Sequence, residues 1–361
     1  MIKKLKKKKI MKLFQKKVII YILKIIKKHT IGNILEKIQY FYEMMEFRGD
    51  KSIRIGFTNF PSAFDSSKKN NFFTSAFRET SFSKFILVKF YNPHIQFFCV
   101  SGNTKKLKNS KAKVKIFYTG ESLYRAPFSR YRNCLDNVDL SLGFDFSDAD
   151  NYLRFPLWLM YYFAPTNSKD DIKSKLNNFK QSYQKTKFCA MLARYDILGM
   201  RTKIYNKLSG IDRIDCPSVV LHNDNSLRKM YNDNKFLYLQ QYKFNICPEN
   251  SSSPGYVTEK LFQSLYSGCI PVYWGWSKDP EPGIINPDII FYYDELDGPN
   301  NKQILNEVKK LHENDKLYRS FVSQPFFCDT AVDKIYTMLQ QYIFKLRSVT
   351  DPVFESNISE R

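Results

Sequence analysis

The segment Tyr242–Gly275 limits the possible fold more than any other part of this 361-residue chain. It starts with the buried-type strand Phe244–Cys247, which a serine-rich loop follows. A helix then begins near Thr258 and ends before Gly268, a residue that suits the left-handed position after a helix. The next strand is Ile270–Trp274. A strand, a crossover helix and a second strand in this order predict a Rossmann-type α/β unit.

Other segments carry the same alternation of short strands and helices. Strands or short extended elements are predicted at Ser52–Phe57, Phe85–Phe90, Ile95–Val100, Val114–Tyr118, Asp139–Phe144, Tyr152–Phe155, Phe188–Ala193 and Ser218–Leu221. Helices are predicted at Ile34–Phe47, at Asn234–Gln241, at Val332–Leu346 and around Met200, Ile204 and Leu208. This pattern predicts an α/β protein with two Rossmann-like domains that face a cleft, in which ligands bind at the carboxyl ends of the strands.

The composition supports this division, because 43% of the residues are hydrophobic and can form a sizeable core. Shifts in polarity along the chain suggest the boundaries. The predicted parts are a basic helical arm at 1–48, an N-terminal α/β domain at 49–165, a polar linker at 166–186, a second Rossmann-like domain at 187–328, and a C-terminal helix and tail at 329–361.

The positive charge of the chain is concentrated at one end. The formal net charge is +22, and residues 1–28 supply twelve lysines and no acidic residue. The longest apolar run there, Val18–Leu23, is too short for a hydrocarbon core that needs about 20 residues. The pattern favours a basic helix that lies on an anionic membrane surface, and a solvated tail is the alternative. The apolar residues of that helix would be Leu13, Phe14, Ile19, Ile20 and Leu23.

Cysteine usage bears on the compartment. The seven cysteines are scattered and none lies in a CxxC pair, which argues against a disulfide framework and for reduced surroundings. Together with the lack of a spanning segment, this favours a membrane-associated protein on the cytoplasmic face, with a Golgi membrane as the alternative. The four histidines have no metal-ligand spacing, so no metal site is predicted.

The loop before the predicted helix at Thr258 has the features of an anion site. A helix N-terminus presents free N–H groups and a partial positive charge, which suit a phosphate. Lys260 lies in the first turn, where the helix dipole disfavours a cation unless an anion binds there. Glu259 can accept hydrogen bonds from two ribose hydroxyls. The alternative is a capped surface helix, and the chain has neither a Walker lysine pattern nor GxGxxG.

Two further residues follow predicted strands. Arg201 would lie on the same sheet edge as Lys260, where two cations could hold a diphosphate, although it could also be a surface residue. Glu121 follows the strand Val114–Tyr118 and could act as a general base at an interdomain cleft, although it could also be an ordinary turn residue. Asp148 and Asp150 are interpreted as a solvated turn rather than a metal-binding pair.

These segments resemble a known family. Tyr242–Asn250, Gly255–Lys260 and Ser267–Gly275 together resemble the donor-binding motif of the α-1,3-fucosyltransferases of glycosyltransferase family 10. Phe117–Glu121 resembles the strand that ends in the family's catalytic Glu, and Tyr152–Leu157 resembles the segment after it. Residues 188–201 resemble the strand and helix with the phosphate-binding Arg. One departure is Pro248, which stands where the family usually has Phe.

The resemblance implies a GT-B fold and an inverting transfer of L-fucose from GDP-fucose to a glycan. Glu121 would deprotonate the acceptor hydroxyl, Arg201 and Lys260 would neutralise the diphosphate, and Glu259 would hold the ribose. Asn250 and Tyr256 would line the region of the phosphates and the fucose. No divalent metal would be required. The acceptor hydroxyl would be O3 of N-acetylglucosamine in a lactosamine-type oligosaccharide, linked to lipid or protein.

Three alternatives remain at this point. One is an inverting GT-B enzyme with a different nucleotide sugar, and another is a structural protein of the membrane surface. The third is a basic nucleic-acid-binding protein, which the charge alone suggests. The absence of RRM, KH and zinc-finger signatures argues against nucleic acid as a partner.

Overall fold

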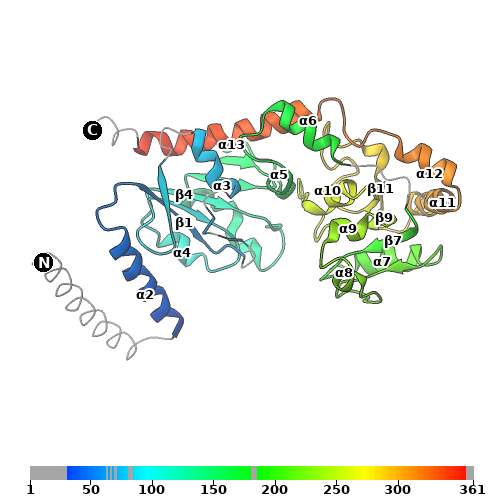
Figure 1. The fold of residues 1–361 in the computed structure, drawn as a ribbon, viewed down its shortest axis with the longest axis horizontal. Coiled ribbons are helices and arrows are strands. Elements are labelled where there is room, and N and C mark those ends of the chain that lie inside the picture. Colours follow the sequence, from blue (N-terminus) through cyan, green and yellow to red (C-terminus); the bar gives the residue numbers. More distant parts are fainter. Residues whose placement is uncertain are drawn as a thin grey trace, which may run out of the picture.

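The computed structural model describes residues 31–61, 64–65, 67–68, 71–79, 84–179 and 185–354. These residues form two halves, each built on a parallel sheet, and the halves lie side by side (Figure 1). The predicted α/β class with two Rossmann-like units is confirmed. The predicted membrane-surface helix at 1–28 lies outside the described residues. The bounds of the five predicted parts stay predictions.

The N-terminal half has a six-stranded sheet in the order β2-β1-β3-β4-β5-β6, and every neighbouring pair is parallel. Its strands are short and mostly apolar, as expected of strands covered on both faces. They are β1 (Ile53–Thr58), β2 (Phe85–Val88), β3 (Ile95–Phe98), β4 (Val114–Tyr118), β5 (Leu140–Gly143) and β6 (Tyr152–Arg154).

Helices surround this sheet and join it to the rest of the chain. They are α2 (Ile31–Glu46), α3 (Phe72–Ser75), α4 (Lys105–Lys108) and α5 (Leu157–Tyr162), with 3₁₀ segments η1 (Ala76–Glu79) and η2 (Phe128–Asn137). Helix α2 is fixed to the sheet by Glu43, whose carboxylate accepts hydrogen bonds from the backbone N–H groups of Lys89, Phe90 and Tyr91 at 2.8–2.9 Å.

The C-terminal half has a five-stranded parallel sheet in the order β11-β10-β9-β7-β8. The strands are β7 (Lys187–Met191), β8 (Ile214–Asp215), β9 (Tyr242–Ile246), β10 (Ile270–Tyr273) and β11 (Phe291–Tyr292). The helices are α7 (Met200–Leu208), α8 (Ser226–Lys229), α9 (Lys235–Leu239), α10 (Glu259–Tyr266), α11 (Pro299–Glu313) and α12 (Asp315–Val322), with the 3₁₀ turn η3 (Pro287–Ile289). Gly268 follows α10 with φ of 68°, as predicted for the residue that ends this helix.

One predicted strand is wrong. Residues 218–221 form bends and turns, and the strand of this region is the shorter β8, which pairs with Cys189 and Ala190 of β7. The apolar residues of the segment are not buried in a sheet, since Val219 is 69% exposed and Leu221 is 39% exposed. Leu221 also has φ of 53°, which is incompatible with an extended strand.

The two halves are connected twice. Residues 163–186 lead from the first half to the second and include helix α6 (Lys169–Asn177), so the predicted linker is partly helical. Helix α6 begins with a capping box formed by Ser168 and Asp171. After α12 the chain returns, and the long helix α13 (Ala331–Phe354) packs on β4, β5 and β6 of the first half (Figure 1).

Strand order determines where a ligand can bind. In the N-terminal sheet, β2 lies on one side of β1 and β3 lies on the other, so the strand order reverses between β1 and β3. In the C-terminal sheet, β8 and β9 lie on opposite sides of β7 in the same way, so the order reverses between β7 and β9. Loops leave in opposite directions at such a reversal, and this opens a crevice at the carboxyl ends of the strands.

Candidate active site

A cavity of about 760 Å³ lies between the two halves. The N-terminal half lines it with residues after β1, β3, β4 and β6, and the C-terminal half lines it with residues after β7 and β9 and with the start of α10. Five of the six predicted site residues line it: Glu121, Asn250, Tyr256, Glu259 and Lys260. The sixth, Arg201, lines a narrow space of about 20 Å³ that shares Tyr195 and Asn250 with this cavity.

Glu121 lies just beyond β4, where its side chain remains 34% exposed. Its backbone N–H donates to Thr119 Oγ1 at 3.1 Å, and the Thr119 hydroxyl donates to the Glu121 carbonyl at 2.6 Å. These two bonds fix the turn. The carboxylate pairs with Arg125, whose Nη2 lies 3.0 Å from Glu121 Oε2. A carboxylate held at a cavity edge in this way can reach the hydroxyl of a ligand bound there.

The start of α10 is built around a buried carboxylate. Glu249, whose side chain is fully buried, accepts hydrogen bonds from Thr258 N and Thr258 Oγ1, both at 2.7 Å. Lys260 Nζ lies 3.3 Å from Glu249 Oε2 and 3.7 Å from Glu259 Oε1. The Lys260 ammonium therefore lies between two carboxylates at the N-terminus of the helix.

The three groups determine one another's charge. Burial raises the pKa of Glu249, against the opposing effect of Lys260. Burial also acts to raise the pKa of Glu259, but Lys260 outweighs it and the pKa lies below the usual value. Burial acts to lower the pKa of Lys260, but the charges of Glu259 and Glu249 outweigh it and hold this pKa above the usual value. The two carboxylates thus favour the charged form of Lys260 in the cavity wall.

Arg201 lies in the first turn of α7, as predicted, and is only 6% exposed. Its guanidinium donates to the carbonyls of Tyr195 at 2.6 Å and Pro248 at 2.9 Å, and to Asn250 Oδ1 at 2.9 Å. Arg201 therefore joins the loop after β7 to the loop after β9 across the strand-order reversal. Pro248, the residue that departs from the family pattern, contributes its carbonyl to this contact.

The loop before α10 also contacts the N-terminal half. Gly255 has φ of 68°, and a Cβ built on it would lie 2.1 Å from the carbonyl oxygen of Phe144. Only glycine allows both this conformation and this close approach. The next residue, Tyr256, is 1% exposed and packs edge-on against the Phe144 ring, with 4.7 Å between centroids. Tyr256 is thus held by both halves.

Further polar contacts cross between the halves. Arg154 of β6 donates to the Gly255 carbonyl at 3.1 Å and pairs with Glu281. Trp158 Nε1 donates to Glu281 Oε1 at 2.7 Å, and the Trp158 ring stacks on Phe262 of α10 with 4.3 Å between centroids. These contacts orient the start of α10 relative to the N-terminal sheet.

Several cavity residues are absent from the sequence-based prediction. The wall contributed by the N-terminal half is largely apolar and aromatic: Phe60, Phe64, Tyr118, Phe128, Leu157, Met160 and Tyr161. Phe60 and Phe64 lie in an irregular segment after β1, Tyr118 ends β4, Phe128 begins η2, and the other three lie in the short helix α5, so only their position at or after a strand end could have indicated them. Glu249 and Arg125 could have been found as charged residues directly after β9 and close to Glu121.

The acidic pair considered for a metal lies away from these groups. Asp148 and Asp150 are both exposed in the turn before β6, which agrees with their interpretation as a solvated turn. Within the described parts of the chain, the structure has no group of three or more His, Cys, Asp and Glu side chains that could hold a metal ion. The same parts contain no helix long and apolar enough to cross a membrane.

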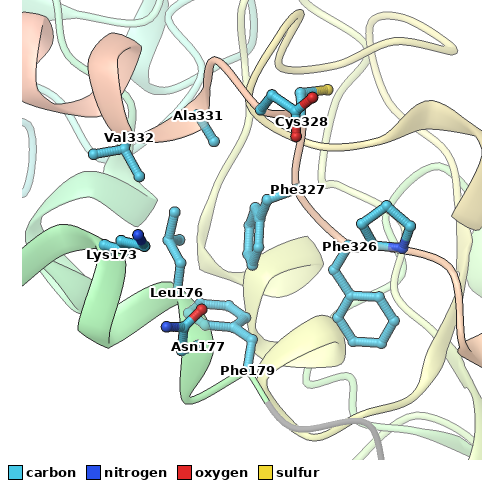
Figure 2. Close-up of a pocket in the computed structure, with 11 residues that line it drawn as sticks. Lys173, Leu176, Asn177, Phe179, Phe326, Phe327, Cys328, Ala331 and Val332 are labelled. Carbon is cyan, nitrogen blue, oxygen red and sulfur yellow. The ribbon is translucent and has the colours of Figure 1, made fainter.

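A second cavity, of about 590 Å³, lies where the two connections between the halves meet. Figure 2 shows its lining, with Lys173, Leu176 and Asn177 from α6 and Phe326, Phe327 and Cys328 from the returning segment. The rings of Phe179 and Phe327 meet edge to face with 4.9 Å between centroids. None of the predicted site residues lies there.

Family models match both halves. Residues 55–161 match the model described as "Alpha-(1,3)-fucosyltransferase FucT N-terminal domain". Residues 181–331 match the model described as "Glycosyltransferase family 10 (fucosyltransferase) C-term". Each of the predicted site residues falls within one of these two ranges.

Individual proteins are similar over part of their length. A putative fucosyltransferase of Acanthamoeba polyphaga mimivirus is 30% identical over 198 residues, which are 52% of this chain and 32% of that protein. The Alpha-(1,3)-fucosyltransferase FucT of Helicobacter pylori is 29% identical over 254 residues, which are 60% of this chain and 48% of that protein. The matched regions thus cover less than half of each of these relatives.

Solved structures share the fold. The crystal structure of an alpha1,3-fucosyltransferase matches with a TM-score of 0.55 and 21% identity, and the match covers 81% of this chain and 90% of that one. The structure with GDP-fucose matches with a TM-score of 0.53 and 22% identity, over 81% and 90% of the chains. At this identity the similarity establishes the two-sheet fold, which is of the GT-B type.

Proposed function

The chain belongs to glycosyltransferase family 10, the fucosyltransferases, and we propose that it transfers L-fucose from GDP-fucose to a hydroxyl group of a glycan. The observation that carries this proposal is the cavity between the halves, where Glu121 of one half faces Asn250, Tyr256, Glu259 and Lys260 of the other. A carboxylate and a cationic helix start on opposite walls are the groups that a sugar transfer between a hydroxyl and a diphosphate needs.

In the proposed reaction, Glu121 takes the proton of the acceptor hydroxyl. The oxygen attacks the anomeric carbon of fucose, the bond from that carbon to the phosphate oxygen breaks, and GDP leaves from the opposite side. The configuration at the anomeric carbon is inverted, and no covalent enzyme intermediate forms. Lys260 and Arg201 offset the negative charge that develops on the leaving diphosphate, and Glu259 binds the ribose.

The proposed acceptor hydroxyl is O3 of N-acetylglucosamine in a lactosamine-type oligosaccharide, carried by lipid or protein. The aromatic wall of the N-terminal half, on the same side as Glu121, supports a sugar as the acceptor. Apolar faces of sugar rings pack against aromatic rings, while the hydroxyls at the ring edge stay free for hydrogen bonds.

The test is incubation of the full chain with GDP-fucose and N-acetyllactosamine, with GDP release and product mass as readouts and NMR for the linkage. We expect both GDP and a product with fucose at O3. The absence of GDP release and of fucosylated product across a panel of glycan acceptors would overturn the proposal. Competition by GDP-mannose and UDP-sugars distinguishes GDP-fucose from the donors of other inverting GT-B enzymes.

We also propose that residues 1–28 bind an anionic membrane on its cytoplasmic face, because they carry twelve lysines and no acidic residue. Each lysine near such a surface contributes about 1 kcal/mol. We expect residues 29–361 to lose affinity for vesicles that contain phosphatidylserine and to retain catalysis. Equal vesicle binding by both forms would contradict the proposal. Protease protection in isolated membranes distinguishes the cytoplasmic face from the Golgi lumen.

A further inference from the structure

Arg125 lies beside Glu121 at the edge of the cavity and lines the adjacent narrow space. Its Nη2 is 3.0 Å from Glu121 Oε2, and its guanidinium carbon lies 5.3 Å from the centre of the Phe128 ring. The same side chain lines the narrow space that also contains Arg201 and Asn250. Arg125 thus contacts the proposed base on one side and the proposed diphosphate region on the other.

The guanidinium has unused hydrogen-bonding capacity in this position. Within the described residues, Arg125 Nε is buried and has no hydrogen-bond partner. A guanidinium carries five N–H donors in a planar fork, and Glu121 is the one side chain in the described structure to which it donates a hydrogen bond. The guanidinium therefore keeps N–H groups that a phosphate oxygen beside the narrow space could accept.

The present partner of Arg125 is easily displaced. The side chains of Arg125 and Glu121 are 24% and 34% exposed, so solvent reaches the pair and screens part of its attraction. A diphosphate carries more charge and accepts two N–H groups of the guanidinium at once, which makes it the stronger partner. A diphosphate bound beside the narrow space would therefore compete with Glu121 for the guanidinium.

We propose that Arg125 is shared between two anions, pairing with Glu121 in the empty site and with the diphosphate when the donor is bound. This inference rests on the proposed function, since it needs a nucleotide diphosphate as ligand. Donor binding removes the cation from Glu121 and frees Oε2 to accept the proton of the acceptor hydroxyl. The base is therefore fully available only after the donor has bound, which gives the reaction an order.

GDP affinity, measured by calorimetry on single and double variants, tests this sharing. We expect Arg125→Gln to weaken GDP binding about ten-fold, because one charge-assisted contact is lost, and Arg125→Lys to restore part of the loss. Arg130→Gln is the matched control from the same segment, since Arg130 is exposed and donates to the Gly102 carbonyl at 2.7 Å. Unchanged GDP affinity in Arg125→Gln would overturn the proposal.

The double variant distinguishes competition for Arg125 from direct repulsion between the Glu121 carboxylate and the phosphates of GDP. We expect Glu121→Gln to tighten GDP binding about three-fold, because the carboxylate no longer competes for Arg125. In the Arg125→Gln background, Glu121→Gln should change the GDP affinity by less than about two-fold. Equal tightening in both backgrounds would show direct repulsion and overturn the sharing. A chain that binds no GDP at all in its unaltered form would instead contradict the proposed function.

Discussion

Arg154 and Glu281 join the two halves of the molecule, with Arg154 Nη2 2.9 Å from Glu281 Oε1 and Nη1 3.2 Å from Oε2. Glu281 is 2% exposed, and its Oε1 also accepts a hydrogen bond from Trp158 Nε1 at 2.7 Å. Arg154 also donates to the Gly255 carbonyl. The pair therefore connects the stability of the interface to the shape of the loop that precedes α10.

Arg154→Gln should lower the free energy of unfolding by about 3–5 kcal/mol, because it leaves the buried Glu281 without its cation. It should also weaken GDP binding, since the Gly255 carbonyl loses its donor. Denaturant unfolding and GDP titration measure the two effects. Adding Glu281→Gln should recover part of the stability, whereas Lys310→Gln, at an exposed ion pair, should change stability by less than about 1 kcal/mol. Additive losses in the double variant would contradict a direct pairing.

Gly255→Ala should reduce both thermal stability and GDP affinity, because the new methyl group would collide with the Phe144 carbonyl and strain a backbone with φ of 68°. Gly49→Ala is the matched control, since φ is 86° there and no atom lies within 4 Å of the added Cβ. The control should cost about 1 kcal/mol from the backbone alone. An equal loss in the two variants would show that the contact with Phe144 is unimportant.

Glu121→Gln should lower turnover by about 10²–10⁴-fold, because the amide cannot accept the hydroxyl proton. Donor affinity should not decrease. Steady-state kinetics and GDP titration check the two expectations. Glu313→Gln, at an exposed surface ion pair, is the control and should leave both quantities unchanged. Loss of GDP binding in Glu121→Gln would show that the residue belongs to the donor site instead.

Lys260→Ala and Arg201→Ala should each weaken GDP binding by about 10–100-fold, the effect of one hydrogen bond to a charged group. Arg201 also holds three acceptors in the loops after β7 and β9, so the thermal midpoint of its variant should fall as well. Lys207→Ala, on the exposed side of α7, is the control. An unchanged GDP affinity would remove the substituted residue from the phosphate site.

The pH dependence of stability should involve Asp215, which does not line the cavity. Burial acts to raise the pKa of Asp215, but hydrogen bonds from Arg213, Lys187 and Tyr242 hold it below the usual value of 3.8. A lowered pKa in the folded state stabilises the fold above the unfolded value, and this contribution is lost as the pH falls through the folded value.

Asp215→Asn should therefore lower the thermal midpoint at pH 7, and the difference from the unaltered chain should shrink at pH values below 3.8. Thermal scans between pH 7 and pH 3 check this. Asp136→Asn, at an exposed position, should have little effect at any of these values. A difference that grows in acid would mean that the Asp215 carboxylate is not stabilised by its partners.

Much of the fold could be predicted because parallel strands have simple sequence patterns. The unit from β9 to β10 follows from apolar runs and from Gly268, and the carboxyl ends of the strands then bring Glu121 and Lys260 to one cavity. An apolar run does not predict a strand where the tertiary structure leaves its residues exposed. Val219 and Leu221 have the apolar character of a strand but lie exposed in turns.

Contacts between distant segments could not be predicted. Arg154 and Glu281 are 127 residues apart, and nothing near either residue indicates the other. The apolar spacing of α13 predicts a helix, yet its return to the N-terminal sheet depends on tertiary packing. Phe60 and Phe64 lie in an irregular loop, so their place in the cavity wall follows only from the arrangement of β1 and its neighbours.

The contact between Phe179 and Phe327 has a mechanical consequence. The chain passes between the halves twice, and these two passages touch at this ring pair. The two connections are thus packed on each other rather than independent of one another. A change at either ring therefore disturbs both connections at once, because each passage packs on the other at this point.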